Sequence, residues 1–404
     1  MKQKTIIHID GNNFFVSCEV LMNPSLKGQP VCVLSNNDGC VVSRSYEAKK
    51  MGVPMGIPYF MSKNKFKGII YLSADFSLYQ EISSRMMQFL YKYSDKVDVY
   101  SIDEAFIDAT GVENVFWLSK KELAAKIKYD IEREVGVSVS VGVAPTKMLA
   151  KLATHKAKSS CGYYVIEPHL IPYELENIKT EDIWGIGKNT ARSLRKYGIF
   201  YAHEILLQDD EFYKINFGKK GVELKYELSG VSVIPLTGIA ELPKSIQRTR
   251  AFPEFSSDKE YIKTELMLHL HNVCKKLREY NLMTSSISVM LRTKDFRVVY
   301  LDKKLNFLTN SELQLTTIIF ELFEKLYQQN VIYRSSGVLA FSLSDIQKTQ
   351  LGLFTNEKLE KSQRIAELID KVEGKFGKGM LLSGNVGIKS VQKKHQRELR
   401  FRSF

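Results

Sequence analysis

The chain lacks the features that would place it in a membrane, outside the cell or around a structural metal. No run of apolar residues approaches the roughly 18 that a membrane-spanning helix needs. The N-terminal segment reaches the acidic Asp10 before the apolar region of a signal peptide could be completed. The cysteines number five and none forms a CxxC pair, which argues against a disulfide framework and a structural zinc site. These absences predict a cytoplasmic protein with reduced, mostly buried thiols.

Signature motifs of several enzyme classes are missing as well. The chain has no Walker A loop, no GxSxG nucleophile elbow, no HExxH zinc motif and no Rossmann fingerprint. None of the enzyme classes that these motifs define is therefore indicated.

What the chain has in excess is positive charge, with 58 Lys and Arg against 45 Asp and Glu and a net charge of +13 over 404 residues. This length predicts two to four domains, and the 44% hydrophobic content is enough for a buried core. A basic surface attracts nucleic acid, acidic lipid or acidic protein, whereas lysine can also serve solubility alone. The motifs have to decide between these interpretations.

Strand and helix patterns alternate in the same order in two regions. In the first region strands are expected at 5–9, 97–100, 105–108 and 137–143, and helices at 78–93, 120–135 and 145–155. In the second region strands are expected at 245–252, 285–291, 298–308 and 331–343, and helices at 257–280 and 311–327. Both regions have the β-α-β-β-α-β order of a ferredoxin-like domain. The segment 24–68 is rich in glycine and proline and predicts an irregular insertion.

Three carboxylates occupy positions that such a sheet can bring together. Asp10 ends the first strand, while Asp103 and Glu104 stand in the turn between two strands that should neighbour it. Clustered carboxylates repel one another unless cations lie between them, and ligation by oxygen alone suits Mg²⁺. The pattern therefore predicts a site for two ions, although acids at strand ends can also be solvated turn residues. Asp108 lies a strand away and is interpreted as structural.

Other side chains near these acids could contact a nucleotide. Phe14 and Phe15 follow Asp10 closely and could wall a sugar, or could simply pack in the core. Lys147 stands at the start of a helix, where a cation and free backbone N–H groups face an anion. Tyr46 and Lys49 share the segment SYEAKK, which alone is weak support for a binding role.

Residues 181–199 predict a nucleic-acid contact. Two short helical patterns flank Gly185-Ile186-Gly187, so that backbone N–H groups together with Lys188, Arg192 or Arg195 could grip a DNA phosphate without reading its sequence. An ordinary turn between two helices is the alternative.

The polar tail holds a short apolar motif, Gln350-Leu351-Gly352-Leu353-Phe354. A peptide of this kind can dock into an apolar groove of another protein.

Several segments together resemble the Y-family translesion DNA polymerases. They are IDGNNFFVSCE (9–19), LSNNDGCVVSRSYEAKKMGVPMG (34–56), YSIDEAFID (100–108), VGVAPTKMLAKLATHKAK (141–158) and IWGIGKNTARSLRKYGI (183–199). The NNDGC segment and GKGMLLSG (377–384) are similar to the UmuC-like branch, the catalytic subunit of DNA polymerase V. The similarity extends from residue 6 to about residue 388.

The resemblance implies an α+β multidomain protein with the right-hand fold of a polymerase. Its parts would be a ferredoxin-like palm (1–20 and 73–170), small fingers (21–72), a thumb with a helix-hairpin-helix (171–240), a β-α-β-β-α-β little finger (241–344) and a C-terminal tail (345–404). The little finger would lay its sheet against DNA.

The resemblance also implies roles for individual residues. The metal-binding acids would be Asp10, Asp103 and Glu104, with the carbonyl of Gly11. The nucleotide would contact Phe14, the steric gate Phe15, Ser43, Tyr46, Lys49 and Lys147. DNA would contact Gly185, Gly187, Lys188, Arg192, Arg248 and Arg250. Lys49 departs from the arginine that is frequent in the family, so a bidentate phosphate contact becomes a point charge.

The activity implied is error-prone addition of dNTPs to a primer 3′-hydroxyl opposite damaged template, by two-metal phosphoryl transfer with Mg²⁺, in an SOS-type damage response. The pentapeptide with Gln350, Leu351, Leu353 and Phe354 is similar to the QLxLF motif that binds the bacterial sliding clamp. A UmuD′-like subunit and RecA are further partners that UmuC-like proteins can require.

Two other functions remain open on the sequence. A non-catalytic DNA-binding scaffold recruited by the clamp would need the basic charge and the hairpin but not the acids. A nucleotidyl cyclase would share the palm but would have no use for DNA-binding parts.

Overall fold

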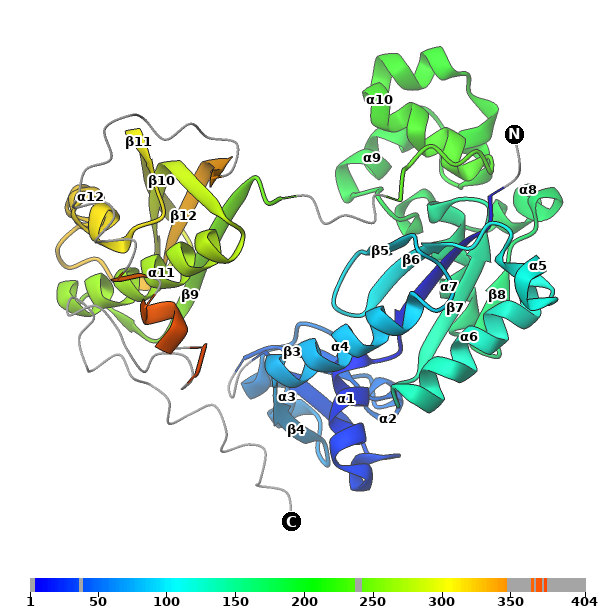
Figure 1. Cartoon of the computed structure of the whole chain (residues 1–404), viewed down its shortest axis with the longest axis horizontal. Helices are drawn as coiled ribbons and strands as arrows, with labels where there is room; N and C mark the ends of the chain where they lie inside the picture. Colours follow the sequence, from blue (N-terminus) through cyan, green and yellow to red (C-terminus); the bar gives the residue numbers. More distant parts are fainter. Residues whose placement is uncertain are drawn as a thin grey trace. The chain divides into compact units, whose positions relative to one another are not determined.

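The computed structural model describes residues 4–35, 39–236, 242–346 and 365–375, the last without 367 and 373. These residues form two compact units, one ending at 236 and the other beginning at 242 (Figure 1). The first unit contains two sheets and the second unit one, and the two units have separate hydrophobic cores.

The first unit is built on a five-stranded sheet with the order β5-β6-β1-β7-β8. Its strands are β1 (Ile6–Gly11), β5 (Val97–Val99), β6 (Glu104–Asp108), β7 (Val139–Ala144) and β8 (Tyr163–Val165). The central strand β1 pairs antiparallel with β6 and with β7. The predicted strands are confirmed, and β8, which pairs parallel with β7, is an addition that the sequence did not predict.

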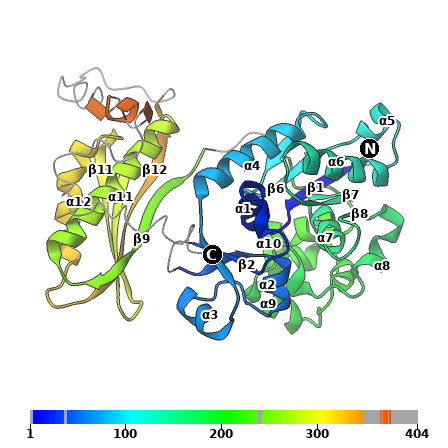
Figure 2. The ribbon, with the colours of Figure 1, turned by 90° about the horizontal axis from the view of Figure 1, so that it is seen from below.

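Successive side chains of a strand point to opposite faces of its sheet, so alternate residues of β1 pack against different helices. Ile7 and Ile9 join a core with the helices α1 (Phe14–Met22), α4 (Phe76–Leu90) and α6 (Lys120–Glu134). Figure 2 shows α1 and α4 side by side. Ile6 instead joins a second core with α7 (Lys147–Ala157). Asp10 has the same parity as Ile6 and therefore lies on the α7 face.

Helix α7 approaches β7 closely because residue 142 is a glycine. An added Cβ at Gly142 would come within 2.3 Å of the carbonyl oxygen of Ala150 and of the backbone nitrogen of Thr154. Both atoms belong to the helix backbone, so neither can move aside as a flexible side chain would. The glycine thus fixes the depth at which α7 lies on the sheet.

We expect Gly142→Ala to lower the free energy of unfolding of this unit by about 3 kcal/mol, because overpacking against a backbone forces a shift of the helix. Both tryptophans, Trp117 and Trp184, lie in this unit, so urea unfolding followed by tryptophan emission measures its stability. Gly187→Ala is the matched control, since no atom lies within 4 Å of its added Cβ. Equal unfolding midpoints for the two variants would contradict the close contact.

The segment predicted to be irregular is in fact folded, and that prediction was wrong. It contributes to a three-stranded sheet, β3-β2-β4, built from β2 (Val31–Leu34), β3 (Val41–Arg44) and β4 (Ile70–Ser73). Two short helices, α2 (Tyr46–Lys50) and α3 (Tyr59–Lys65), complete it. Each strand is only four residues long, which is too short for a period of two to stand out between glycines and prolines.

A helical region, 171–236, packs on the α7 side of the first unit. It contains α8 (Ile171–Leu175), α9 (Lys188–Lys196) and α10 (Asp210–Leu228). The fully buried Glu227 of α10 links this region to α7. Its carboxylate accepts hydrogen bonds from the backbone N–H of Met148 in α7 and from those of Val233 and Ile234. The first of the two predicted helices around Gly185 is only a 3₁₀ turn, Thr180–Asp182.

The second unit has a four-stranded antiparallel sheet with the order β11-β10-β12-β9. Its strands are β9 (Ser245–Ser256), β10 (Leu282–Thr293), β11 (Val298–Thr309) and β12 (Tyr333–Asp345), and its helices are α11 (Lys259–Glu279) and α12 (Glu312–Leu326). Both helices share one core with the sheet, and this confirms the predicted β-α-β-β-α-β order. The helical stretch near residue 370 is tied to α11, where Arg278 Nε donates to Asp370 Oδ2 at 2.6 Å.

Two predictions from the composition can be compared with these units. None of the helices within the described ranges combines the length and apolar character that crossing a membrane requires. All five cysteines are free thiols, and Cys18, Cys32 and Cys274 are buried, as predicted.

Candidate active site

The three carboxylates predicted from the sequence lie together where the central strand β1 ends and the neighbouring strand β6 begins. Asp10 stands opposite Glu104 in the antiparallel register of β1 and β6. The backbone N–H of Gly11 donates to the carbonyl of Asp103 at 2.8 Å, which fixes the end of β1 to the turn before β6. Asp10 and Glu104 have the parity of the face that α7 covers, so α7 can supply their counter-charges.

Each carboxylate has a polar partner of its own. Lys158 Nζ lies 2.7 Å from Asp10 Oδ1, and Ser101 Oγ donates to Asp103 Oδ1 at 2.6 Å. Glu104 Oε2 receives both Lys151 Nζ and, at 3.1 Å, His8 Nε2.

As arranged, the described residues contain no group of three His, Cys, Asp or Glu side chains that could hold a metal ion. The donor chemistry nevertheless fits Mg²⁺, because carboxylate oxygens and a backbone carbonyl are hard ligands.

The two neighbouring acids in the turn have pKa values shifted in opposite directions. Burial raises the pKa of Asp103, the hydrogen bond from Ser101 opposes the rise, and the charges of Asp10 and Glu104 add to it. Burial also acts to raise the pKa of Glu104, but hydrogen bonds from His8 and Lys151 outweigh it and lower that pKa to about 2. Glu104 is therefore an anion at any physiological pH, stabilised by the ammonium of Lys151.

Helix α7 provides cations at this edge that the sequence interpretation missed. Lys151 and Lys158 reach Glu104 and Asp10, and both line a cavity of about 450 Å³ beside the carboxylates. The spacing of residues 147, 151 and 158 could have predicted them, because steps of four and seven residues place side chains on one face of a helix.

Lys147, the lysine predicted to hold a phosphate, lies elsewhere. It is 5% exposed, pairs with Asp98 on β5 and donates to the carbonyl of Pro235 at 2.7 Å.

The two predicted aromatic residues have different environments. Phe15 is partly buried and stacks on Tyr79, with ring centroids 4.5 Å apart and an interplanar angle of 12°. Phe76 meets the Phe15 ring edge-on at 5.8 Å. Phe14 is only 3% exposed and belongs to the core, which was the alternative considered for this residue.

A second cationic group comes from the three-stranded sheet and the helix after it. Lys49 lies 4.9 Å above the ring of Tyr46, which is half exposed, and Ser43 is buried in β3. Burial lowers the pKa of Lys49, and the charges of Arg44 and Lys158 lower it further. Arg44, which the sequence interpretation did not select, is thus an electrostatic neighbour of Lys49.

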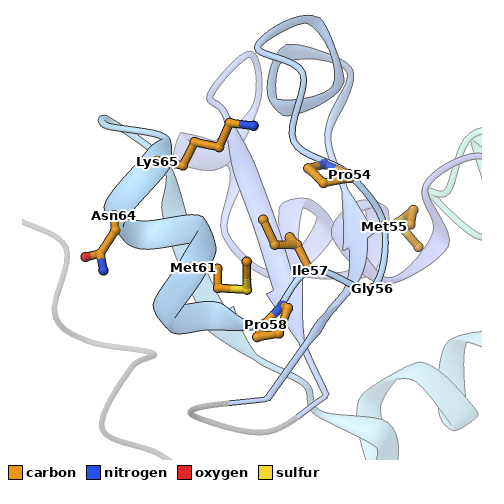
Figure 3. A pocket seen from close by; sticks show the side chains of 8 residues that line it. All are labelled: Pro54, Met55, Gly56, Ile57, Pro58, Met61, Asn64 and Lys65. Atoms are coloured by element: carbon orange, nitrogen blue, oxygen red, sulfur yellow. The ribbon is translucent and has the colours of Figure 1, made fainter.

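An apolar depression of about 710 Å³ lies between the loop 54–58 and α3 (Figure 3). It is lined by Pro54, Met55, Gly56, Ile57, Pro58, Met61, Asn64 and Lys65. Its lining has no acid, histidine or cysteine, so it offers no group for acid-base or metal chemistry.

The predicted DNA-contacting residues are exposed in both units. Gly185 has φ +87°, and Gly187 precedes α9 with open space around it. Lys188 and Arg192 are exposed on α9.

In the second unit the DNA contacts predicted from the resemblance, Arg248 and Arg250, are exposed on β9, the edge strand of the sheet. The predicted clamp motif, Gln350 to Phe354, lies outside the described residues, as does GKGMLLSG.

Comparisons with known proteins give consistent results. A model of the impB/mucB/samB family matches residues 9–155, and a model of the C-terminal domain of that family matches residues 243–353. The chain is 31% identical to Protein UmuC of Salmonella typhimurium, over 94% of this chain and 93% of that protein. It is 28% identical to DNA polymerase IV 1 of Bacillus subtilis, over 95% and 93%.

Solved structures of similar proteins are also DNA polymerases. A Y-family DNA polymerase chimera, Dbh-Dpo4(243-245)-Dbh, matches with a TM-score of 0.71 and 29% identity, over 84% of this chain and 99% of that one. An insertion ternary complex of Dbh DNA polymerase matches with a TM-score of 0.55 and 27% identity, over 84% and 99%.

Proposed function

Because the chain belongs to the impB/mucB/samB family and is a UmuC-like DNA-directed DNA polymerase of the Y-family, we propose that its catalytic centre is the carboxylate edge at Asp10, Asp103 and Glu104. The observation that carries this proposal is the pairing of Asp10 with Glu104 across β1 and β6, with Asp103 joined to Gly11. Two Mg²⁺ ions held by these acids and the Gly11 carbonyl would neutralise charge on the attacking and leaving oxygens.

In the proposed reaction the primer 3′-hydroxyl attacks the α-phosphate of a dNTP, one P–O bond forms, and the bond to the departing pyrophosphate breaks. The protein needs no nucleophile of its own, and its residues position the reactants and balance their charge. Lys158 suits this task because it is 41% exposed and, among the described residues, has Asp10 as its ion-pair partner. Exchange of that carboxylate for a phosphate would bring it to the incoming nucleotide.

We propose that the triphosphate binds between Lys158 and the cations of the small sheet. Lys49 and Arg44 supply charge there, and Ser43 and Tyr46 supply hydroxyl groups. Lys158 takes the role expected of Lys147, which is 5% exposed and is held by both Asp98 and the carbonyl of Pro235. Phe15 would abut the sugar as the steric gate, with Tyr79 stacked behind it.

We propose that the parts of the chain correspond to the polymerase subdomains within the limits that the resemblance predicts. The sheet with β1 would belong to the palm (1–20 and 73–170), the small sheet to the fingers (21–72), the helical region to the thumb (171–240) and the sheet of the second unit to the little finger (241–344). One similar solved structure is an insertion ternary complex of Dbh DNA polymerase, and we propose that primer-template DNA and dNTP bind to this chain.

The hairpin at Gly185–Gly187 is expected to contact phosphates, so its cations should set the salt dependence of DNA binding. We expect Lys188→Ala and Arg192→Ala each to reduce the slope of log Kd against log salt by about one. Fluorescence anisotropy of labelled primer-template over a salt series measures the slope.

Arg195→Ala is the control for this series, because Arg195 is paired with Glu181 and should change the slope less. Slopes unchanged in the first two variants would remove the hairpin from the DNA contact.

We propose that residues 350–354 bind a sliding clamp, which would keep the polymerase near its primer through effective concentration. Binding of the full chain to clamp should be lost in a Leu353→Ala, Phe354→Ala variant, as measured by surface plasmon resonance. A UmuD′-like subunit and RecA are proposed as further partners, and activity assays should include them.

The proposed function is tested by primer extension on an abasic template, with dNTPs, Mg²⁺ and the candidate partners. Insertion opposite the lesion and extension beyond it are expected, and such activity would place the enzyme in tolerance of DNA damage. Tight primer-template binding with no incorporation under every condition would favour the scaffold instead. Formation of a cyclic nucleotide from NTP alone would favour the cyclase.

A further inference from the structure

Lys151 is held between a catalytic carboxylate and two aromatic rings. Its ammonium contacts Glu104 Oε2 and lies 4.7 Å from the ring centroid of Tyr100 and 5.4 Å from that of Trp184. An ammonium above aromatic faces is attracted by their quadrupoles, and the attraction grows as water is removed. The Lys151 side chain is 24% exposed. These contacts restrict Lys151 on several sides.

The two rings are also fixed to each other and to the strand that carries Glu104. Trp184 meets Tyr100 edge-on at 5.3 Å and donates its indole N–H to the Tyr100 hydroxyl at 3.2 Å. The backbone N–H of Tyr100 donates to the carbonyl of Glu104 at 3.0 Å. Phe106, two residues after Glu104, lies 5.7 Å from the Trp184 ring.

The two rings come from segments with different proposed tasks. Tyr100 belongs to the turn before the catalytic acids, whereas Trp184 directly precedes Gly185 of the proposed DNA-contacting hairpin. The cluster therefore joins the segment that would grip DNA to the carboxylate that would hold a metal ion.

Lys151 differs from Lys158 in its exposure and in its contacts. Lys158 is 41% exposed, and among the described residues its ammonium pairs with Asp10, while that of Lys151 contacts one carboxylate and two rings. A lysine held in this way is suited to orient a group rather than to travel to a substrate. Lys151 and His8 both contact Glu104 through Oε2, so neither of these two side chains occupies Oε1.

We propose that Lys151 is a positioning residue that fixes the orientation of the Glu104 carboxylate, and that Trp184 and Tyr100 make this orientation depend on the placement of the DNA-contacting hairpin. The proposal rests on the proposed polymerase function. Groups that orient a metal ligand from behind commonly change activity by ten- to a hundredfold when they are removed.

Removing the Lys151 charge should have two opposite effects, which separates positioning from mere structural support. The ammonium repels a divalent ion nearby, so Lys151→Met should tighten Mn²⁺ binding by about threefold. The same change frees the Glu104 carboxylate to rotate, so the rate of nucleotide incorporation should fall by about tenfold. A residue with only a structural role would weaken Mn²⁺ binding, incorporation and stability together.

The experiment uses the full chain bound to primer-template. Incorporation of one dNTP is followed under single-turnover conditions, and free Mn²⁺ is counted by electron paramagnetic resonance. Lys151→Arg should keep the rate within about threefold, because a cation at this position is retained. The control is Lys121→Met, the same change at an exposed position on α6, which should leave both quantities unchanged.

The link to the hairpin is tested with Trp184. Trp184→Ala should slow incorporation by about fivefold while the Kd for primer-template stays within about twofold, and Trp184→Phe should retain most of the rate. If the Kd and the rate worsen in parallel, Trp184 supports only the hairpin, and the coupling is overturned.

The outcomes also distinguish this proposal from the proposed function. A wild-type chain that incorporates nothing contradicts the polymerase activity, and the Mn²⁺ measurement then still decides the role of Lys151. Unchanged Mn²⁺ affinity in Lys151→Met overturns the positioning role, whether or not the wild type is active. An incorporation rate within twofold of an active wild type overturns it as well.

Discussion

Asp103→Asn is expected to reduce nucleotide incorporation by about a thousandfold while primer-template binding stays unchanged. The substitution keeps the shape of the side chain but removes the negative charge that the reaction needs from a metal ligand. Glu104→Gln should have an effect of similar size, because its carboxylate stands opposite Asp10 at the same edge. Single-turnover incorporation on an undamaged template measures the loss, and anisotropy of labelled DNA measures binding.

Asp108 offers a matched control on the same strand as Glu104. It lies at the other end of β6, where its carboxylate accepts a hydrogen bond from the backbone N–H of Thr110. Asp108→Asn therefore makes the same chemical change away from the proposed site, and the rate should stay within about twofold. Loss of activity in Asp108→Asn, or full activity in Asp103→Asn, would show that the catalytic centre has been misassigned.

Phe15→Ala is expected to let ribonucleotides in, with the preference for dNTP over NTP falling by about a hundredfold. The ring is held on Tyr79 at 4.5 Å and against Phe76 at 5.8 Å, so it cannot easily move away from a 2′-hydroxyl. Discrimination of this kind is a steric difference between two transition states, and removing the ring removes most of it. The ratio of kcat/KM for dCTP and CTP opposite template guanine measures the change.

Two further variants separate the gate from general damage to the fold. Phe15→Tyr keeps the ring and should keep the discrimination. Phe14→Leu removes a neighbouring ring from the core, where Phe14 is 3% exposed, and should lower stability without changing sugar preference. If Phe15→Ala retained full selectivity against CTP, another residue would have to form the gate.

The central strands and their acids could be predicted from the sequence because their signals are local. Strand β1 is an apolar run that ends at an acid, and β7 alternates valines with small residues at a period of two. Asp10, Asp103 and Glu104 were placed together by the order of the strands alone. The antiparallel register then determines which residue lies opposite which.

The cations around these acids could not be placed in the same way. Which lysine of α7 reaches the site depends on how the helix lies on β7, and that contact is set by Gly142, a long-range feature of packing. Lys147 begins the helix, but the helix runs towards Asp10, so Lys158 near its end lies beside that acid. The partnership of Lys151 with Trp184 is likewise between segments 33 positions apart in the chain.

The opposition of Asp10 and Glu104 across β1 and β6 also bears on how such a chain can change over evolutionary time. A strand repeats every two residues, so inserting or deleting one residue within β1 or β6 would turn an acid to the face away from α7. Substitution of one apolar residue for another in these strands leaves the register of the acids unchanged, whereas a change in strand length alters that register. We therefore expect insertions and deletions among descendants of this chain to collect in surface loops and to be rare in these two strands.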